Sequence, residues 1–265
     1  MPKILKVNFS TTSLAFAVKQ VLEWENQDEQ HYIVTPNPEI ILAAQKNHKF
    51  LSVLNKADFS IPDGIGILWA SKYLAISKNN KSKIVKITKW LLSLSAIAIY
   101  PPYIREILPE RVTGVDLMKS IIKQTKQPVF LLGAAPGIAE KAATALNSKN
   151  IVGTYAGSPS EKESAKAIKK INNSAAKILF VAYGAPAQEL WIARHLKNLK
   201  NIKIAVGVGG SFDFISGTKK RAPKSMQKLG LEWLYRIAQE PKRIKRIYNA
   251  TVKFPLTILR TSFKN

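Results

Sequence analysis

Apolar residues along this chain alternate between short runs with the period of a β-strand and longer stretches with the period of a helix. The short runs predict six strands, at residues 32–35, 57–61, 129–133, 151–155, 178–183 and 202–208. Helical patterns follow most of them, for instance at 38–56 and 138–149, and Asn37 and Pro38 suit the cap and first residue of a helix. The alternation predicts an α/β fold with a Rossmann-like, mostly parallel sheet flanked by helices.

One segment breaks this alternation. Lysines continue up to Lys89, and an uncharged stretch then runs from Trp90 to Tyr100. This stretch is too short to span a bilayer as a helix, which needs about 20 residues. A basic flank, an apolar middle and aromatic residues at the edges are typical of a segment that lies in the membrane interface. A buried core helix or a contact between copies of the chain fits the pattern equally well.

The end of the chain is strongly basic. Between Gly217 and Asn265, thirteen lysines and arginines stand against two acids, Glu232 and Glu240, which gives a net charge of +11. Apolar residues at helical spacing accompany this charge, so we predict a core at 1–216 and a basic amphipathic helical appendage at 217–265. We expect the appendage to bind a membrane surface, and a solvated helix packed on its own domain is the alternative.

Composition narrows the classes of function. The 265 residues include no cysteine, which excludes disulfides, a cysteine nucleophile and thiolate metal sites. The first residues do not resemble a signal peptide, so no export is implied. The formal net charge of +24 favours an anionic partner, which is a nucleic acid, a phosphorylated substrate or an acidic membrane leaflet.

Polar side chains follow two of the predicted strands, where ligands of such sheets bind. Thr35 and Asn37 lie in a turn stiffened by two prolines, where they could hold a sugar or phosphate, although a helix cap in a rigid turn explains them as well. Asp63 and Gly64 end the next strand. A carboxylate there can act as general base toward a hydroxyl, but Asp-Gly is also ordinary turn chemistry.

Glycines follow three other strands. The turn from Gly133 to Gly137 could cradle a phosphate at a helix start, yet the chain lacks the P-loop and dinucleotide fingerprints. Gln188 and its neighbour Glu189 lie at the next helix start, where a carboxylate also has a capping role. Gly209 ends the last strand, and tight turning and close ligand approach explain it equally well.

A metal site is poorly supported by the sequence. The three histidines, His31, His48 and His195, lack metal-ligand spacing, and no Asp-x-Asp pair is present. We therefore expect no metal and no cofactor. If a diphosphate is bound, arginine must stabilise its charge, because guanidinium groups bind phosphate through two parallel hydrogen bonds.

Six motifs, taken in chain order, resemble the WecG/TagA/CpsF family, which is glycosyltransferase family 26. They are Thr-Pro-Asn-Pro-Glu at 35–39, Ala-Asp at 57–58, Pro-Asp-Gly-Ile-Gly at 62–66, Glu-Arg-Val-Thr-Gly at 110–114 with Asp-Leu at 116–117, Gly-Ala-Pro-Ala-Gln-Glu at 184–189, and Leu-Glu-Trp-Leu-Tyr-Arg at 231–236. The match follows the family's order over most of the chain, so it is far more specific than any single motif.

The resemblance implies an inverting, metal-independent transfer of N-acetylmannosamine or its uronic acid from UDP to polyprenyl-diphosphate-linked N-acetylglucosamine. Members work as peripheral proteins at the cytoplasmic face of the membrane, in the synthesis of teichoic acid or other cell-surface polysaccharides. By position, Asp63 matches the base that deprotonates the acceptor hydroxyl. The residues that match the family's sugar and phosphate pocket are Thr35, Asn37, Arg111 and Gln188. The residues that match the family's C-terminal appendage are Arg236, Arg243 and Arg246. This appendage is linked to membrane docking and to the acceptor or donor diphosphate.

The sequence departs from the family in two places. Ala187 stands where a lysine is common, which puts one polar contact in doubt. Residues 81–107 look like an insertion before Glu110 and Arg111, and we expect this insertion to be an additional membrane-contacting element.

Two other functions compete with the transferase. Nucleic-acid binding is permitted by the charge, but no nucleic-acid motif is present and the basic residues accompany apolar faces, so we expect no nucleic-acid partner. A nucleotide-dependent oxidoreductase is suggested by the α/β pattern and the glycine loops, but the missing dinucleotide fingerprint makes this an analogy of fold alone. A homo-oligomer remains open.

Overall fold

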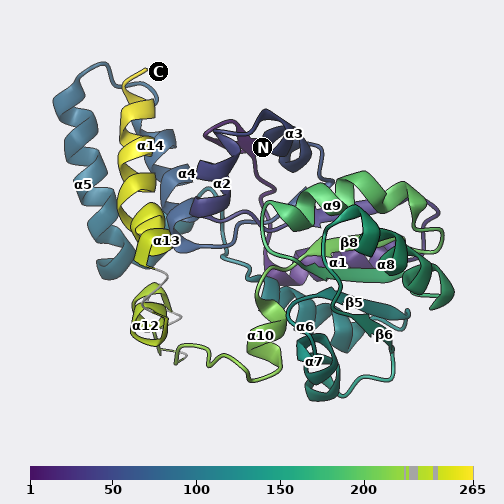
Figure 1. Ribbon diagram of the computed structural model, residues 1–265. Coiled ribbons are helices and arrows are strands. Elements are labelled where there is room, and N and C mark those ends of the chain that lie inside the picture. Colours follow the sequence, from purple (N-terminus) through teal and green to yellow (C-terminus); the bar gives the residue numbers. More distant parts are fainter. Residues whose placement is uncertain (224, 227–231, 241–243, 265) are drawn as a thin grey trace.

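The computed structural model, which describes residues 1–223, 225–226, 232–240 and 244–264, contains a six-stranded sheet whose strands are all parallel (Figure 1). Its order is β4-β3-β8-β7-β5-β6. The strands are β3 (His31–Val34), β4 (Phe59–Ser60), β5 (Val129–Gly133), β6 (Ile151–Tyr155), β7 (Ile178–Ala182) and β8 (Ile204–Gly207). The predicted α/β class is confirmed, and each expected strand is present within a few residues. An antiparallel pair, β1 (Lys3–Ile4) and β2 (Val7–Asn8), was not expected because strands of two residues are too short to show a period.

Helices cover both faces of the sheet, which explains why its strands are apolar throughout. In β7, Ile178 and Phe180 face one side, whereas Leu179 and Val181 face the other. The first face is covered by α1 (Leu14–Trp24), α6 (Gly114–Gln124), α7 (Ile138–Leu146) and α10 (Ser211–Ile215). The second is covered by α8 (Glu161–Asn173), α9 (Ala187–His195) and the short η2 (Leu196–Asn198).

The helix expected at 38–56 is in fact two helices, α2 (Pro38–Ala44) and α3 (His48–Asn55). Asn47 causes the break, because its backbone is extended and its side-chain oxygen accepts a hydrogen bond from the Phe50 N–H at 3.0 Å. This is the geometry of a new N-cap, which ends one helix and begins the next. The predicted cap of α2 is confirmed, since Asn37 Oδ1 accepts from the Ile40 N–H at 3.0 Å.

A second layer, built mainly of helices, lies beside the sheet and has its own apolar core. Its elements are α4 (Ile65–Ser77), α5 (Lys83–Ile99), η1 (Pro101–Arg105) and α14 (Phe254–Ser262). Figure 1 shows α5 and α14 side by side. Since Phe254 and Ile258 are fully buried in this core, the last helix of the chain is an integral part of the layer. The elements before it are α12 (Glu232–Gln239), α13 (Ile244–Tyr248) and the π-helical turn η4 (Asn249–Lys253).

Two lysines of α5 bind the ends of its neighbours. Lys86 is buried, and its ammonium group donates to the Ser262 carbonyl in the last turn of α14. Lys89 donates to the Ile76 carbonyl in the last turn of α4 at 2.7 Å. Carbonyls in the last turn of a helix lack partners within the helix and carry partial negative charge, so lysine ammonium groups stabilise them. These two lysines of the predicted basic flank therefore bind protein groups.

Two indoles fix the inner face of α5. Trp69 of α4 donates to the Ser93 hydroxyl at 2.9 Å, and Trp90 donates to the Pro255 carbonyl at 3.1 Å. Trp90 is partly buried and its indole N–H binds a protein group, so this side chain packs on the helical layer, and the predicted membrane contact of the stretch from Trp90 to Tyr100 stays a prediction. The outer face of α5 is apolar and exposed at Ile84, Ile87, Leu91, Leu92, Ile99 and Tyr100.

We predict that Ser93→Ala lowers the free energy of unfolding by about 1–3 kcal/mol, because it leaves the buried Trp69 N–H without an acceptor. Urea denaturation monitored by circular dichroism measures this change. Ser95→Ala is the matched control on the same helix, since that hydroxyl is exposed and binds only the Leu92 carbonyl. Equal stability of the two variants would contradict the prediction.

Candidate active site

A pocket of about 700 Å³ opens at the carboxyl ends of β3, β4, β7 and β8 and reaches the helical layer. Parallel strands end at one edge, and loops after strands at that edge bind the ligands of such sheets. Of the residues predicted for the site, seven line this pocket, namely Thr35, Asn37, Asp63, Arg111, Gln188, Gly209 and Arg246. Gly133 does not, although its neighbour Ala134 does.

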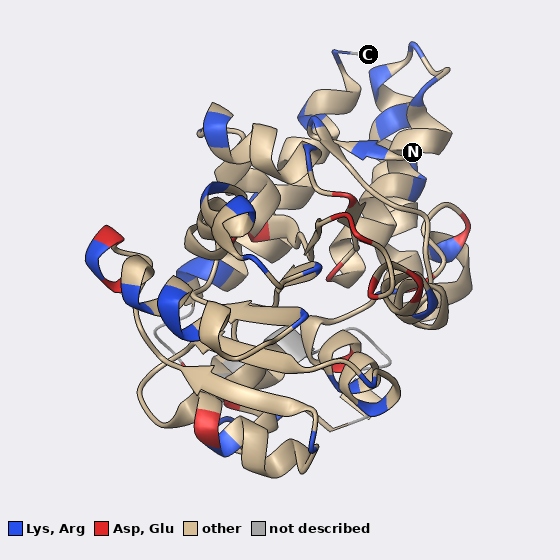
Figure 2. Cartoon of the chain, turned by 90° about the vertical axis from the view of Figure 1, so that its right-hand side faces the viewer, with Lys and Arg blue, Asp and Glu red and all other residues tan. Residues whose placement is uncertain are grey.

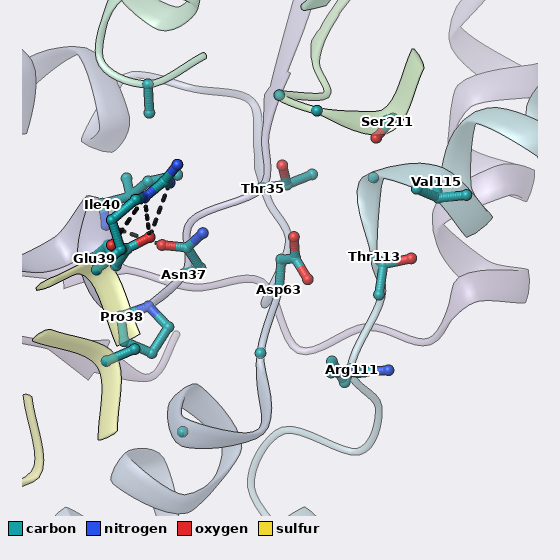
Figure 3. Close-up of a pocket in the computed structure, with 18 of the residues that line it drawn as sticks. Thr35, Asn37, Pro38, Glu39, Ile40, Asp63, Arg111, Thr113, Val115 and Ser211 are labelled. Atoms are coloured by element: carbon teal, nitrogen blue, oxygen red, sulfur yellow. Dashed lines mark hydrogen bonds and ion pairs between the residues drawn. The ribbon is translucent and has the colours of Figure 1, made fainter. Parts of the chain in front are cut away.

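Thr35 and Asn37 are held by the turn between β3 and α2. The buried Thr35 hydroxyl donates to the Gly207 carbonyl at the end of β8, at 3.1 Å. The oxygen of Asn37 is used for capping, and Figure 3 shows its amide nitrogen on the side of Thr35 and Asp63. The predicted cap and the predicted pocket position of Asn37 are thus compatible, because the amide oxygen caps α2 while the amide nitrogen points into the pocket.

Asp63 lies near the centre of the pocket in a rigid turn. Its backbone N–H donates to the Pro36 carbonyl at 3.1 Å, which ties the turn after β4 to the turn after β3. Gly64 has φ +139°, a conformation that favours glycine, and a Cβ there would lie 3.2 Å from Pro38 Cδ. Figure 3 shows the Asp63 carboxylate between Asn37 on one side and Arg111 and Thr113 on the other.

Arg111 reaches the same turn from a distant part of the chain. The N–H of the next residue, Val112, donates to the Pro62 carbonyl at 3.0 Å, so Arg111 lies beside Asp63. Thr113 then caps α6, accepting a hydrogen bond from the Asp116 N–H at 3.2 Å. The motif at 110–114 thus places a guanidinium group at the pocket and begins the helix that supports it.

Gln188 is almost fully buried and connects two strand ends. Its oxygen accepts from the Gly184 N–H at 3.2 Å and the Gly209 N–H at 2.9 Å, and its nitrogen donates to Glu189 at 2.8 Å. Burial raises the pKa of Glu189 to about 7, although the bond from Gln188 favours the ionised form. Gln188 is thus a buried residue of the pocket lining that fixes the loops after β7 and β8.

The two glycines of the predicted site serve different purposes. Gly133 has φ +102°, and a Cβ there would lie 2.9 Å from the Ala182 carbonyl carbon, so close packing of β5 against β7 accounts for it. Gly209 has φ +54°, and a Cβ there would meet no atom of the described residues within 4 Å. Its N–H is bound by Gln188, so turning and close approach of a ligand both remain compatible with Gly209.

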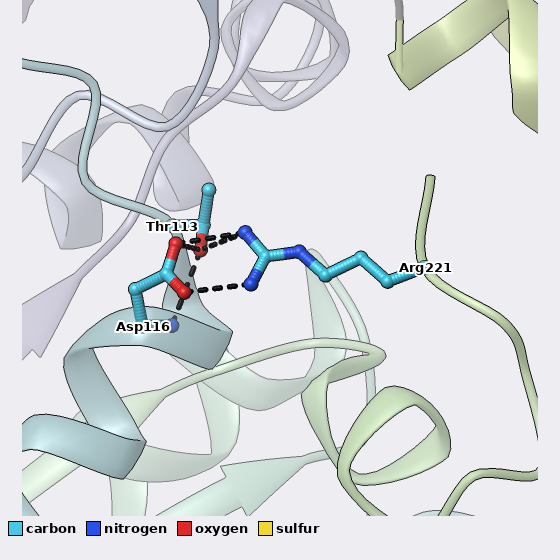
Figure 4. Close-up of polar contacts among 3 residues, drawn as sticks. All are labelled: Thr113, Asp116 and Arg221. Carbon is cyan, nitrogen blue, oxygen red and sulfur yellow. Dashed lines mark hydrogen bonds and ion pairs between the residues drawn. The ribbon is translucent and has the colours of Figure 1, made fainter. Parts of the chain in front are cut away.

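Arg221 lines the pocket and was not predicted from the sequence. Its guanidinium group binds both oxygens of Asp116, at 2.6 and 2.7 Å, and also reaches the Thr113 hydroxyl at 3.3 Å (Figure 4). Burial of Asp116 opposes ionisation, but the bonds from Arg221 and Thr113 and the charges of Arg221 and Arg111 outweigh it and lower the pKa of Asp116. No motif distinguishes Arg221 within its basic run.

Arg246 approaches the pocket from α13. It forms a two-pronged ion pair with Glu39 in the first turn of α2, with Nε to Oε1 at 3.1 Å and Nη2 to Oε2 at 2.9 Å. Arg243 lies outside the described residues, and for Arg236 the structure describes the backbone in α12 alone. Their predicted roles stay predictions.

Within the described ranges, no group of three His, Cys, Asp or Glu side chains could hold a metal ion. The charged groups of the pocket lining are the cations Arg111, Lys219, Arg221 and Arg246 and the acids Glu39, Asp63 and Asp213. Lysines and arginines occur on every side of the molecule in the view of Figure 2.

A family model described as the glycosyl transferase WecG/TagA/CpsF family matches residues 2–104 and 96–265. The chain belongs to this family. It is also 32% identical over 251 residues to an N-acetylglucosaminyldiphosphoundecaprenol N-acetyl-beta-D-mannosaminyltransferase of Staphylococcus aureus strain MRSA252, covering 92% of this chain and 87% of the relative. The protein of the same name from strain MW2 is 31% identical over the same length and coverage.

Membership of the WecG/TagA/CpsF family confirms the resemblance drawn from the motifs and makes the chain a glycosyltransferase. The structure brings four of the six motifs to one pocket or its supporting helices. Ala57 and Asp58 instead precede β4, where Asp58 accepts a hydrogen bond from the Tyr32 N–H at 2.9 Å, and the last motif falls partly outside the described residues. Ala187, where the family commonly has lysine, is the first residue of α9. No helix in the described part of the chain is long and apolar enough to cross a membrane.

We predict that Glu189 makes the protein less stable as the pH rises. The carboxyl of Glu189 has a raised pKa in the folded state, so its contribution is fully present below the ordinary value of 4.5 and is lost as the pH rises through about 7. Wild type should lose about 3 kcal/mol relative to Glu189→Gln across this window. Urea denaturation at several pH values measures the difference, with the exposed Glu161→Gln as control. Parallel pH profiles of wild type and Glu189→Gln would refute it.

Proposed function

We propose that this glycosyltransferase moves N-acetylmannosamine, or its uronic acid, from a UDP donor to polyprenyl-diphosphate-linked N-acetylglucosamine. The observation that carries the proposal is a pocket whose lining includes Asp63 and four cationic side chains, with Arg111 beside Asp63. The name of the two Staphylococcus aureus relatives includes an N-acetylglucosaminyl-diphosphate lipid and the sugar N-acetylmannosamine. Cell-surface polysaccharide or teichoic acid synthesis is the setting that such an acceptor serves.

In the proposed reaction Asp63 is the general base. Its carboxylate removes the proton from the acceptor hydroxyl, and the oxygen attacks the anomeric carbon of the donor from the face opposite UDP. The bond between that carbon and the UDP oxygen breaks as the new glycosidic bond forms, so the configuration inverts. The rigid turn at Asp63 supports this role, because a base must be held within hydrogen-bond reach of the proton it removes.

The leaving UDP carries the negative charge that develops in the transition state. Arg111, Arg221 and Lys219 of the pocket lining supply positive charge without a metal ion, and guanidinium groups suit a diphosphate because they donate two parallel hydrogen bonds. Thr35, Asn37 and Gly209 would bind the sugar or phosphate groups directly. Gln188 would keep their loops in place.

We infer that the protein docks on the cytoplasmic, anionic face of the membrane through the outer face of α5. Leu91 and Leu92 are 57% and 65% exposed, and Ile84 and Ile99 extend the same apolar surface to both ends of the helix. Exposed lysines at 81 and 83 adjoin it, so apolar burial and attraction to anionic lipids would add. The lipid-linked acceptor requires such an approach.

We predict that Asp63→Asn lowers kcat by about 10²–10⁴-fold, because the amide cannot accept the proton. The assay uses UDP-N-acetylmannosamine and a short-chain lipid-diphosphate acceptor. Asp213→Asn is the matched control, since Asp213 lines the same pocket and pairs with Lys219. We expect less than a tenfold effect there, and full activity of Asp63→Asn would remove Asp63 from the role of base.

A separate prediction concerns the membrane. The double variant Leu91→Gln and Leu92→Gln should reduce co-sedimentation with anionic liposomes by about tenfold, because two exposed leucines no longer enter the interface. Val152→Gln, an exposed apolar residue on the edge strand β6, should leave binding unchanged. If the double variant instead binds liposomes normally and dissociates an oligomer in light scattering, α5 is a contact between copies of the chain.

A further inference from the structure

The pocket has an apolar wall that the transfer reaction itself does not use. The residues of this apolar wall are Ile40, Ile65, Trp69, Leu94, Ile97, Ala98, Ile247 and Pro255, all of which line the pocket. Three of these, Leu94, Ile97 and Ala98, come from α5, the helix that the sequence predicted to be an insertion. The inserted helix thus contributes to the reaction pocket as well as to the surface.

The position of this wall is fixed by polar contacts on the inner face of α5. Lys86 binds the end of α14, Ser93 binds Trp69, and Trp90 binds Pro255. These residues precede Leu94 and Ile97 by about three helical turns or fewer, so α5 cannot rotate without breaking buried hydrogen bonds. Leu94 and Ile97 are only partly buried, and their remaining surface faces the cavity.

Cationic and apolar parts of the lining meet at one place. Arg246 and Ile247 are consecutive residues of α13, and both line the pocket. Ile97 and Ala98, near the end of α5, also line the pocket, and the next residues, Ile99 and Tyr100, are 81% and 61% exposed. A ligand that fits this order has an anionic group next to a hydrocarbon chain that leads out toward the surface.

We propose that the wall formed by Leu94, Ile97 and Ala98 binds the first isoprenoid units of the lipid carrier, next to the acceptor diphosphate. The inference rests on the proposed function, which supplies a polyprenyl diphosphate as the acceptor. A UDP-sugar offers no hydrocarbon to cover this wall, whereas an isoprenoid chain does. Apolar surface in a cavity gains free energy when hydrocarbon replaces water.

The test compares two acceptors that share the N-acetylglucosaminyl diphosphate group, one with a farnesyl tail and one with a methyl ester. Wild type should show a KM at least about tenfold lower for the farnesyl acceptor, because one buried aliphatic side chain corresponds to roughly that factor. The assay contains no liposomes, so docking of the outer face does not contribute. Equal KM values for the two acceptors in wild type would overturn the proposal.

Variants locate the effect on α5. Leu94→Gln with Ile97→Gln should remove the farnesyl preference while leaving kcat and the KM for the methyl acceptor unchanged. Ala98→Trp is a second variant at an exposed position, which preserves folding and fills the cavity, and it should also abolish the preference. Leu91→Gln with Leu92→Gln is the matched control on the outer face and should keep it. Retention of the preference in both inner-face variants would overturn the assignment.

Calorimetry separates this inference from the proposed function. Farnesyl diphosphate should bind wild type at least about tenfold more tightly than inorganic diphosphate, and the inner-face variants should lose that difference. If wild type binds farnesyl diphosphate in this way but transfers no sugar, the proposed function fails and the isoprenoid subsite stands. If it transfers sugar without any dependence on the tail, the subsite fails and the function stands.

Discussion

The side-chain amide of Gln188 holds the pocket-lining loops in one arrangement. Its oxygen accepts from Gly184 after β7 and Gly209 after β8, and its side chain is almost fully buried. A Cβ at Gly207 would lie 2.9 Å from the amide nitrogen, and the Gly207 carbonyl in turn accepts from Thr35 after β3. Since an unmade buried hydrogen bond costs about 1–3 kcal/mol, the ends of these three strands are fixed relative to one another.

The strands and the pocket edge could be predicted from the sequence because both depend on local pattern. An apolar run that ends in Thr35 or Asp63 predicts a strand and the loop after it, and parallel strands bring such loops together. The break at Asn47 was missed because an asparagine within an apolar helical period is read as a surface position. Arg221 was missed for a different reason, since its partner Asp116 lies 105 residues away and nothing in a basic run indicates which cation has a carboxylate.

The helix α5 shows why composition alone does not assign the two faces of a helix. Lysines, an apolar middle and a tryptophan predicted one membrane-contacting surface, yet Lys86, Lys89 and Trp90 bind carbonyls of α14, α4 and Pro255. The lysines lie inward because helix ends offer unpaired carbonyls, which are as good a partner for an ammonium group as a lipid phosphate. The solvent-exposed face of α5 is mainly apolar from Ile84 to Ile99. Membrane docking through this face would therefore depend more on hydrocarbon surface than on charge.

Arg221 and Arg246 both line the pocket and both bind a carboxylate through two hydrogen bonds, but they differ in how far they are exposed to solvent. Arg221 is 21% exposed and binds both oxygens of a half-buried carboxylate, so it is a fixed charge that helps to anchor the segment after α10 to α6. Arg246 is 56% exposed, and a surface ion pair such as that with Glu39 contributes about 0–1 kcal/mol. A diphosphate offers a guanidinium group more charge and the same two-pronged geometry as a carboxylate. In the proposed reaction Arg246 would therefore exchange Glu39 for a substrate at little cost, whereas Arg221 would remain bound to Asp116 beside the pocket.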